Sequence, residues 1–208
     1  MGDYLDPYGW EGITRKDAIN NFQEIIDFKL QNKDKVVLLT GNHDCHYIDK
    51  HNFHKCSRYD SSNAHHIEEM FRSHRSLFTL AYEKTIADKK FLLTHAGLIL
   101  PWYNLHKDII GELTVENLNS LLNSPQGMRA LSEVSFYRWG PDQFGSMVWL
   151  DIHEMNNNEK QNIPWDYQIF GHTQQEENPI INDKWACIDC RKTFILDENG
   201  NLEKINER

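Results

Sequence analysis

Apolar residues recur every three or four positions between residues 18 and 30, which predicts an amphipathic helix that ends near residue 31. Thr14, followed three positions later by Asp17, forms the pattern of a cap at its start. Residues 35–40 then make a short apolar run, rich in Val and Leu and bounded by Gly41. Such a run predicts a buried parallel strand.

Helices and short strands alternate along the rest of the chain. Residues 65–78 predict a helix, and residues 79–86 and 90–94 predict paired strands around a turn at Asp88. Residues 101–135 are mostly helical in pattern, with Thr114 opening one run. Further strands are expected at residues 147–150, 167–170, 185–188, 193–196 and 202–205, the last after a hairpin turn at residues 198–201. This order predicts an α/β sandwich of two sheets, in one domain over residues 1–208.

Composition narrows the class of protein. The 208 residues are 39% hydrophobic and 25% charged, as in globular chains. The net charge of −9 argues against nucleic acid as a partner, because phosphate-backbone binding needs clustered Lys and Arg. No apolar run is long enough for a membrane span, and no signal peptide is visible. Four cysteines in a chain of this length favour a reducing cytoplasm over a disulfide framework.

Four short polar segments stand where strands are expected to give way to loops. They are GDYLD at residues 2–6, GNHD at residues 41–44, THAG at residues 94–97 and GHT at residues 171–173. Loops at one edge of a sheet would bring together one potential ligand from each: Asp3, Asn42, His95 and His172. Carboxylate, amide and imidazole donors suit a hard-to-borderline divalent metal. Taken one at a time, each is also an ordinary turn or strand-end residue.

The four segments, in this order, resemble those of the calcineurin-like metallophosphoesterases, on the branch of the serine/threonine protein phosphatases and their bacterial and phage relatives. That family carries D-x-H, G-D-x-x-D-R-G, G-N-H-[ED], H-[GA]-G and a late G-H-T. The D-x-H motif is absent here, and Pro7 stands where the family has Arg. The resemblance implies the family's α-β-β-α sandwich, without its first strands. It also implies that residues 45–64 and 101–145 are excursions over the site.

The resemblance implies a metal-dependent phosphoester hydrolase in which hydroxide attacks a phosphomonoester. Asp3 would bridge two ions, and Asn42, His95 and His172 would complete the ligand set of the second ion. Manganese is favoured, although Fe, Zn, Ni and Mg tolerate these donors. His43 would be the general acid that protonates the leaving group, and Asp6 would orient its imidazole.

Arginine side chains hold the phosphate in this family, because a planar guanidinium matches two phosphate oxygens. Arg58 and Arg138 are the candidates to replace the Arg lost at Pro7. A surface or aromatic-stacking role for each remains open. His46, His51, His54 and Cys56 fit no standard zinc spacing, so a solvated lid is favoured for their segment.

The missing D-x-H motif suggests that the chain is an N-terminally truncated form that keeps one of two metal ions. Three functions are then open. The first is a phosphatase acting on a phosphorylated protein or small phosphoester. The second is an impaired phosphate- or phosphoprotein-binding module. The third is a nucleotide or dinucleotide polyphosphate hydrolase. The sequence does not indicate an oligomeric state.

Overall fold

The largest sheet in the computed structural model, which describes residues 1–205, has five strands in the order β3-β4-β5-β7-β6. The strands are β3 (Ala81–Ile86), β4 (Lys89–Thr94), β5 (Tyr167–Phe170), β6 (Ile180–Ile181) and β7 (Trp185–Cys187). β4, β5 and β7 run parallel, and the edge strands β3 and β6 are antiparallel to their neighbours. The carboxyl ends of the three parallel strands therefore lie at one edge of the sheet.

Two smaller pairs of strands accompany this sheet. β1 (Leu38–Leu39) pairs in parallel with β2 (Phe78–Thr79), and β8 (Phe194–Leu196) forms a hairpin with β9 (Leu202–Lys204). Between β2 and β3 the chain turns away from strand pairing, because the backbone N–H groups of Leu80 and Ala81 both donate to Oδ1 of Asn119. The chain is thus a mixed α/β protein with several sheets, as its pattern predicts.

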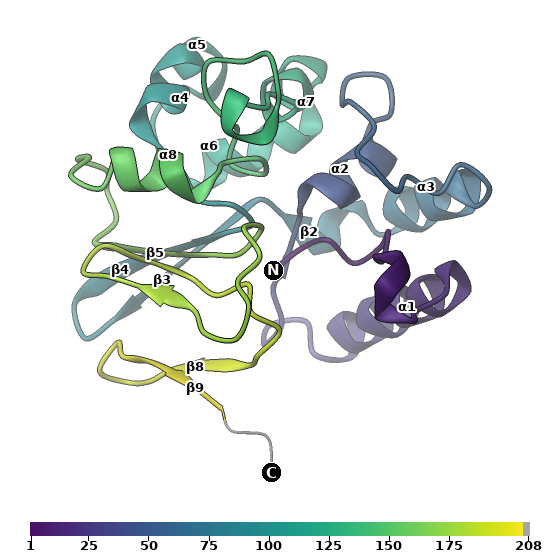
Figure 1. Cartoon of the computed structure of the whole chain (residues 1–208), viewed down its shortest axis with the longest axis horizontal. Helices are drawn as coiled ribbons and strands as arrows, with labels where there is room; N and C mark the ends of the chain where they lie inside the picture. Colours follow the sequence, from purple (N-terminus) through teal and green to yellow (C-terminus); the bar gives the residue numbers. More distant parts are fainter. Residues whose placement is uncertain (206–208) are drawn as a thin grey trace.

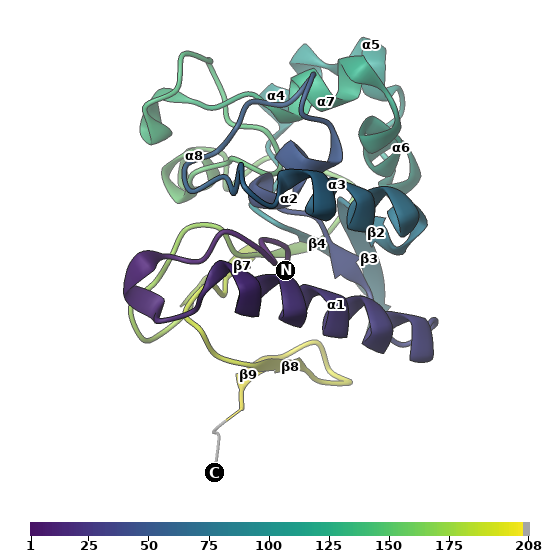
Figure 2. The same cartoon turned by 90° about the vertical axis from the view of Figure 1, so that its right-hand side faces the viewer.

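One group of helices covers a face of the five-stranded sheet. A second group surrounds the separate short pair β1-β2 (Figures 1 and 2). The helices are α1 (Arg15–Gln31), α2 (Asn42–Ile48), α3 (Ala64–Ser73), α4 (Leu100–Leu105), α5 (Lys107–Ile110), α6 (Val115–Ser120), α7 (Pro125–Leu131) and α8 (Ile152–Asn157), with short 3-10 turns at Gly9–Glu11, Arg75–Leu77, Leu121–Asn123 and Phe136–Arg138. The predicted cap of α1 is present, since Thr14 Oγ1 accepts the N–H of Asp17. Thr114 caps α6 in the same way.

Several sequence predictions are corrected by the structure. Residues 45–64 are not a solvated lid, because they begin inside α2 and bury side chains such as His46, Phe53 and Cys56. Residues 147–150 form a turn rather than a strand, and the carbonyl of Met147 accepts the N–H of Ala96. The strand predicted at residues 35–40 is reduced to β1, since its only partner among the described residues is the equally short β2. Helix α8 and strand β6 were not predicted.

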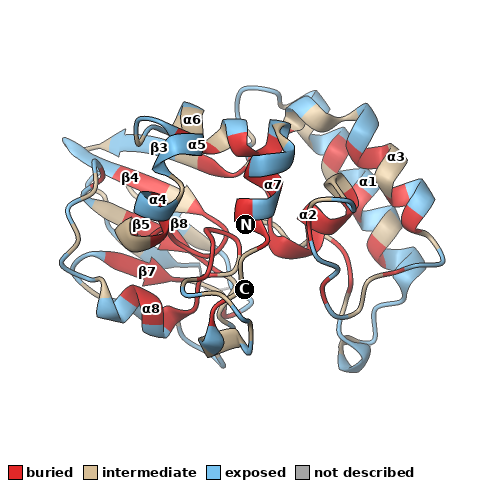
Figure 3. Cartoon of the chain, turned by 90° about the horizontal axis from the view of Figure 1, so that it is seen from above, coloured by how far each residue is buried: buried red, intermediate tan, exposed pale blue. Residues whose placement is uncertain are grey.

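Two hydrophobic clusters hold these elements. The larger packs α4, α6, α7 and α8 against the sheet around Trp102 and Trp185, and the smaller joins α1 and α3 around Phe22 and Phe71. Figure 3 shows the buried residues concentrated along the strands and around α2, and the first residue of the chain lies between the two groups of elements (Figure 1). Among the described residues, no helix is both long and apolar enough to cross a membrane.

Candidate metal centre

Two histidines follow adjacent parallel strands. His95 comes directly after β4, and His172 comes two positions after β5. The strands are paired so that the N–H of Gly171 donates to the carbonyl of His95 at 2.7 Å. The end of one strand therefore carries its imidazole next to the imidazole from the other.

The four predicted metal-binding side chains converge on Nε2 of His95. This atom lies 3.0 Å from Nδ1 of His172, 3.2 Å from Oδ1 of Asn42 and 3.4 Å from Oδ2 of Asp3. Asp3 comes from the first loop and Asn42 from the start of α2, so four distant segments meet here.

Most of the atoms that meet at Nε2 of His95 carry a lone pair and no hydrogen, so they cannot form hydrogen bonds with one another. His95 donates its Nδ1 proton to the carbonyl of Met1 at 2.7 Å, which leaves Nε2 of a neutral ring unprotonated. Asn42 turns its amide nitrogen toward Sγ of Cys56 and therefore presents its oxygen to the cluster. Oxygen and nitrogen lone pairs that face one another without a proton repel, and a cation between them removes that repulsion. The residues present thus fit a divalent metal.

Burial keeps both imidazoles in the neutral form that metal binding needs. It lowers the pKa of His95, against the opposing charge of Asp3. It lowers the pKa of His172 further, with help from the positive charge of Arg138. His172 also has a buried Nε2 atom without a hydrogen-bond partner in the described structure.

Asp44 holds the loop of Asp3 against the start of α2. Its Oδ2 accepts the N–H groups of Asp3 and Gly41, both at 2.8 Å, and its Oδ1 accepts that of Tyr4 at 3.1 Å. Burial first, and then the charge of Asp3, raise the pKa of Asp44. Three donated N–H groups oppose this effect and fix the loop in place.

Gly41 allows the close approach of the two segments. A Cβ atom at this position would lie 2.1 Å from Oδ1 of Asp3 and 2.7 Å from Cε1 of His95. Its backbone is extended, so the need for glycine comes from the space and not from the φ angle. The hydrogen of Gly41 therefore leaves room for two of the four converging side chains.

Left-handed backbone marks the same region. Among the eight described non-glycine residues with positive φ, four are predicted site residues: Asp3, Asp6, Arg58 and His172, with φ from 58° to 66°. This conformation is uncommon for residues with a Cβ atom and tends to occur at functional sites.

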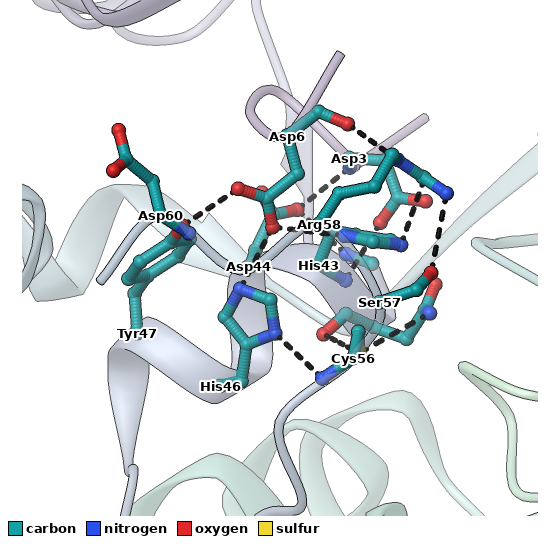
Figure 4. A network of polar contacts seen from close by, with 12 residues as sticks. Asp3, Asp6, His43, Asp44, His46, Tyr47, Cys56, Ser57, Arg58 and Asp60 are labelled. Carbon is teal, nitrogen blue, oxygen red and sulfur yellow. Dashed lines mark hydrogen bonds and ion pairs between the residues drawn. The ribbon is translucent and has the colours of Figure 1, made fainter. Parts of the chain in front are cut away.

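A second polar network lies next to the convergent ligands and is built on α2 (Figure 4). His43 donates from Nδ1 to Oδ2 of Asp6 at 2.9 Å, and its backbone N–H donates to Oδ1 of Asp3. One helical turn later, Tyr47 donates to Oδ1 of Asp6 at 2.6 Å. His46 brings Nε2 to 2.9 Å from Oδ2 of Asp6. Residues three and four positions apart share a helix face, so α2 directs all three side chains at one carboxylate.

Asp6 stays ionised in spite of its burial. Loss of solvent alone would raise its pKa, but the contacts from His43, His46 and Tyr47 outweigh that effect and lower the pKa to about 2. A fixed negative charge therefore faces the Nδ1 side of His43.

Arg58 covers the other edge of His43. Its Nη2 lies 3.1 Å from Nε2 of His43, and its Nε donates to the carbonyl of Asp6 at 2.8 Å. The guanidinium also stacks on the ring of Tyr8, at 3.7 Å from the centroid. Because Arg can only donate, Nε2 of His43 accepts, and the proton of a neutral ring sits on Nδ1.

Arg138 lies on the His172 side. Its Nη2 donates to Oγ1 of Thr173 at 2.6 Å, and its Nε lies 3.2 Å from Oδ2 of Asp151. Burial lowers the pKa of Arg138, and the charge of Asp151 opposes this. Its side chain is thus held by partners of its own, in contrast to Arg58, which contacts His43 directly.

Sequence reasoning assigns His46 only to a solvated lid and gives Tyr47 no role, because the polarity of residues 45–64 predicts a loop. Their spacing from His43 on a helix was the signal that could have identified them. Sequence reasoning also missed the hydrogen bond from the backbone of Asp3 to Asp44, which joins residues 41 positions apart.

Comparison with known proteins adds one finding. The sequence model of a family described as calcineurin-like phosphoesterase matches residues 1–176. No curated protein and no solved structure matched the chain. The matched range includes all four converging residues, His43, Asp6 and both arginines.

Proposed function

The chain belongs to the calcineurin-like phosphoesterase family, a family of metal-dependent hydrolases, and on that premise we propose that it is a phosphomonoesterase of the serine/threonine protein phosphatase type. The observation that carries the proposal is the convergence of Asp3, Asn42 and His172 on Nε2 of His95. Such a donor set can hold a divalent metal next to a histidine backed by a carboxylate.

We assign metal binding to Asp3, Asn42, His95 and His172. When bound, a divalent cation polarises the phosphoryl oxygens and activates a water molecule for attack on phosphorus. Manganese suits this mixture of oxygen and imidazole donors. Asp44 and Gly41 support the site by positioning Asp3.

His43 is the proposed general acid. Its Nδ1 is anchored on Asp6, so its Nε2 is the atom that can deliver a proton to the leaving oxygen. The ionised Asp6 stabilises the positive ring that holds that proton. His46 and Tyr47 contact Asp6, which orients His43, and this makes them positioning residues.

Arg58 is the proposed phosphate ligand. In the structure its Nη2 occupies the place next to Nε2 of His43 that the leaving oxygen needs. A substrate phosphate would draw Nη2 onto one of its own oxygens and so release Nε2 of His43 to carry a proton. Stacking on Tyr8 keeps the rest of the guanidinium in position during this exchange. Arg138, held by Thr173 and Asp151, orders the loop of His172 and adds positive charge for phosphate.

The substrate class we propose is a phosphorylated protein or a small phosphomonoester. The negative net charge disfavours long nucleic acids, although it allows a nucleotide. The free thiols of the described cysteines suit a reducing compartment such as the cytoplasm.

The direct test is hydrolysis of p-nitrophenyl phosphate and of a phosphoserine peptide with added Mn²⁺. We expect turnover that disappears in Asn42→Ala and survives in Asn157→Ala, an exposed asparagine of α8. Binding of inorganic phosphate without turnover in Mn²⁺ would instead support a phosphate-binding module. Turnover of dinucleotide polyphosphates alone would point to the nucleotide alternative.

A further inference from the structure

A stack of four planar side chains leads from the edge of His43 to the surface. Its inner member is Arg58, whose Cζ lies 3.7 Å from the centroid of the Tyr8 ring. A guanidinium at this distance occupies one face of Tyr8, so the ring of Trp10 stacks on the other, with the centroids 5.5 Å apart. The outer member is Arg191, whose Cζ lies 4.2 Å from the centroid of Trp10. We call these four residues the aromatic stack.

Glu11 joins the outer end of the aromatic stack to its inner ring. Its Oε2 accepts the backbone N–H of Tyr8 at 2.7 Å, and its Oε1 accepts an N–H of Arg191 at 2.9 Å across 180 positions of sequence. The carboxylate also compensates the charge of Arg191. Arg58, in contrast, pairs with no carboxylate in the described structure, and its partners are a carbonyl, a hydroxyl and an imidazole. Arg58 is therefore the cation of the stack that can meet an anion.

Stacking suits the movement that the proposed function asks of Arg58. Contact between two planar faces fixes the plane of a guanidinium, but it does not fix the direction of each N–H group within that plane. Nη2 can therefore leave His43 for a phosphate oxygen while the contact with Tyr8 persists. The ring of Tyr8 is itself 37% exposed, so it needs the ring of Trp10 behind it to keep one orientation. A group that is held ready in this way loses less conformational freedom when its ligand binds.

We propose that Tyr8 and Trp10 are positioning residues for the substrate phosphate. The aromatic stack holds the guanidinium of Arg58 in the plane in which it can exchange the imidazole of the general acid for a phosphate oxygen. Trp10 acts through Tyr8, and the remaining members keep Trp10 in place. The positioning role rests on the proposed function of Arg58, whereas the stacked arrangement itself does not.

Binding of inorganic phosphate to the protein loaded with Mn²⁺, measured by isothermal titration calorimetry, tests the positioning role. Trp10→Ala removes the ring behind Tyr8, so phosphate affinity should fall roughly threefold to tenfold. Trp10→Phe keeps an aromatic ring and should retain most of the affinity. Trp139→Ala is the matched control, because Trp139 is 97% exposed and Trp10 is 64% exposed. This control should bind phosphate as the intact protein does.

Nuclear magnetic resonance detects the aromatic stack without metal or substrate. The ring current of Tyr8 should shift the Nε–H signal of Arg58 away from that of a free arginine, and the hydrogen bond to the carbonyl of Asp6 should slow its exchange with water. Arg58→Ala assigns the signal by removing it. In Trp10→Ala the shift should shrink and the exchange should quicken, whereas both should persist in Trp10→Phe.

The outcomes separate the positioning role from the proposed function. Equal phosphate affinity in Trp10→Ala and the intact protein overturns the positioning role, and so does an equal loss in Trp10→Ala and Trp139→Ala. If Arg58→Ala alone loses affinity, the proposed function stands without the stack. A shifted Arg58 signal in a protein that binds no phosphate with Mn²⁺ would refute the proposed function, and the positioning role with it, and leave only the stacked arrangement. Far-ultraviolet circular dichroism checks that each variant folds.

Discussion

Nε2 of His95 lies 3.0 Å from Nδ1 of His172, although 77 positions of sequence separate the two residues. The pairing of β4 with β5 brings them together, and the N–H of Gly171 fixes the register by donating to the carbonyl of His95. Asn42 and Asp3 approach the same nitrogen from two further segments. The arrangement makes physical sense as a cation site, because facing lone pairs are otherwise unfavourable.

Gly41→Ala should impair this site although the substitution adds only one methyl group. The added Cβ would meet Oδ1 of Asp3 at 2.1 Å and the His95 ring at 2.7 Å, so one of these ligands must move. We expect Mn²⁺ affinity to fall at least roughly tenfold, and the free energy of unfolding to drop by about 1–3 kcal/mol through overpacking. Equilibrium dialysis with Mn²⁺ and urea unfolding measure the two effects.

Gly9→Ala is the control, because a Cβ there has nothing within 4 Å. Unchanged Mn²⁺ affinity in Gly41→Ala would show that Asp3 and His95 do not act together as ligands.

His43→Ala should slow the reaction in a way that depends on the leaving group. A general acid contributes roughly 10²–10⁴-fold when the leaving oxygen is basic, so hydrolysis of phenyl phosphate should fall by that order. Hydrolysis of 2,4-dinitrophenyl phosphate should fall much less, because its leaving group needs no proton. The measurement is kcat for both substrates. His51→Ala, on the exposed loop after α2, should leave both values unchanged. An equal loss for the two substrates would remove His43 from the role of acid.

Arg58→Ala should act chiefly on phosphate binding. Removal of a guanidinium that meets phosphate oxygens should raise KM and weaken inhibition by inorganic phosphate, since hydrogen bonds to charged groups contribute about 1.5–3 kcal/mol each. Arg72→Ala on α3 is the control, because Arg72 is exposed and pairs with Glu69. An unchanged inhibition constant for phosphate would leave Arg58 a structural role alone, through its contacts with Tyr8, His43 and the carbonyl of Asp6.

Asp6 should contribute to acid stability. Its pKa falls from 3.8 to about 2 on folding, so the folded state binds fewer protons than the unfolded state between these values. The stabilisation is complete above the unfolded pKa and is lost as the pH falls through the folded pKa, and it amounts to at most about 2 kcal/mol. Urea unfolding between pH 5 and pH 2, with Asp6→Asn as the comparison, measures it. Parallel curves for the two proteins would contradict the low pKa of Asp6.

Much of the fold follows from local pattern. The cap of α1 at Thr14, the hairpin around Asp88 and the strand ending before Gly171 all have signals within a few residues, and all are present in the structure. The strand-end positions of His95 and His172 were enough to predict that they lie together. The prediction failed where tertiary contacts decide the conformation.

Residues 45–64 illustrate that limit. Their polarity indicates a solvated loop, yet His46 and Cys56 are buried because Asp6, Asn42 and each other supply polar partners. Such satisfaction of polar atoms depends on contacts between segments, which composition does not reveal. The same holds for Arg58, whose stacking on Tyr8 could not be inferred from either residue alone.

We claim that four side chains share one cation, and Mn²⁺ binding by Asn42→Ala, measured beside the intact protein, decides whether they do. Asn42 carries no charge, so its removal leaves the electrostatic attraction of Asp3 unchanged and isolates the loss of one ligand. We predict at least one Mn²⁺ per intact chain in equilibrium dialysis, and at least a roughly tenfold weaker affinity in the variant. Equal Mn²⁺ affinity in the two proteins, or no Mn²⁺ bound to either, would contradict the claim.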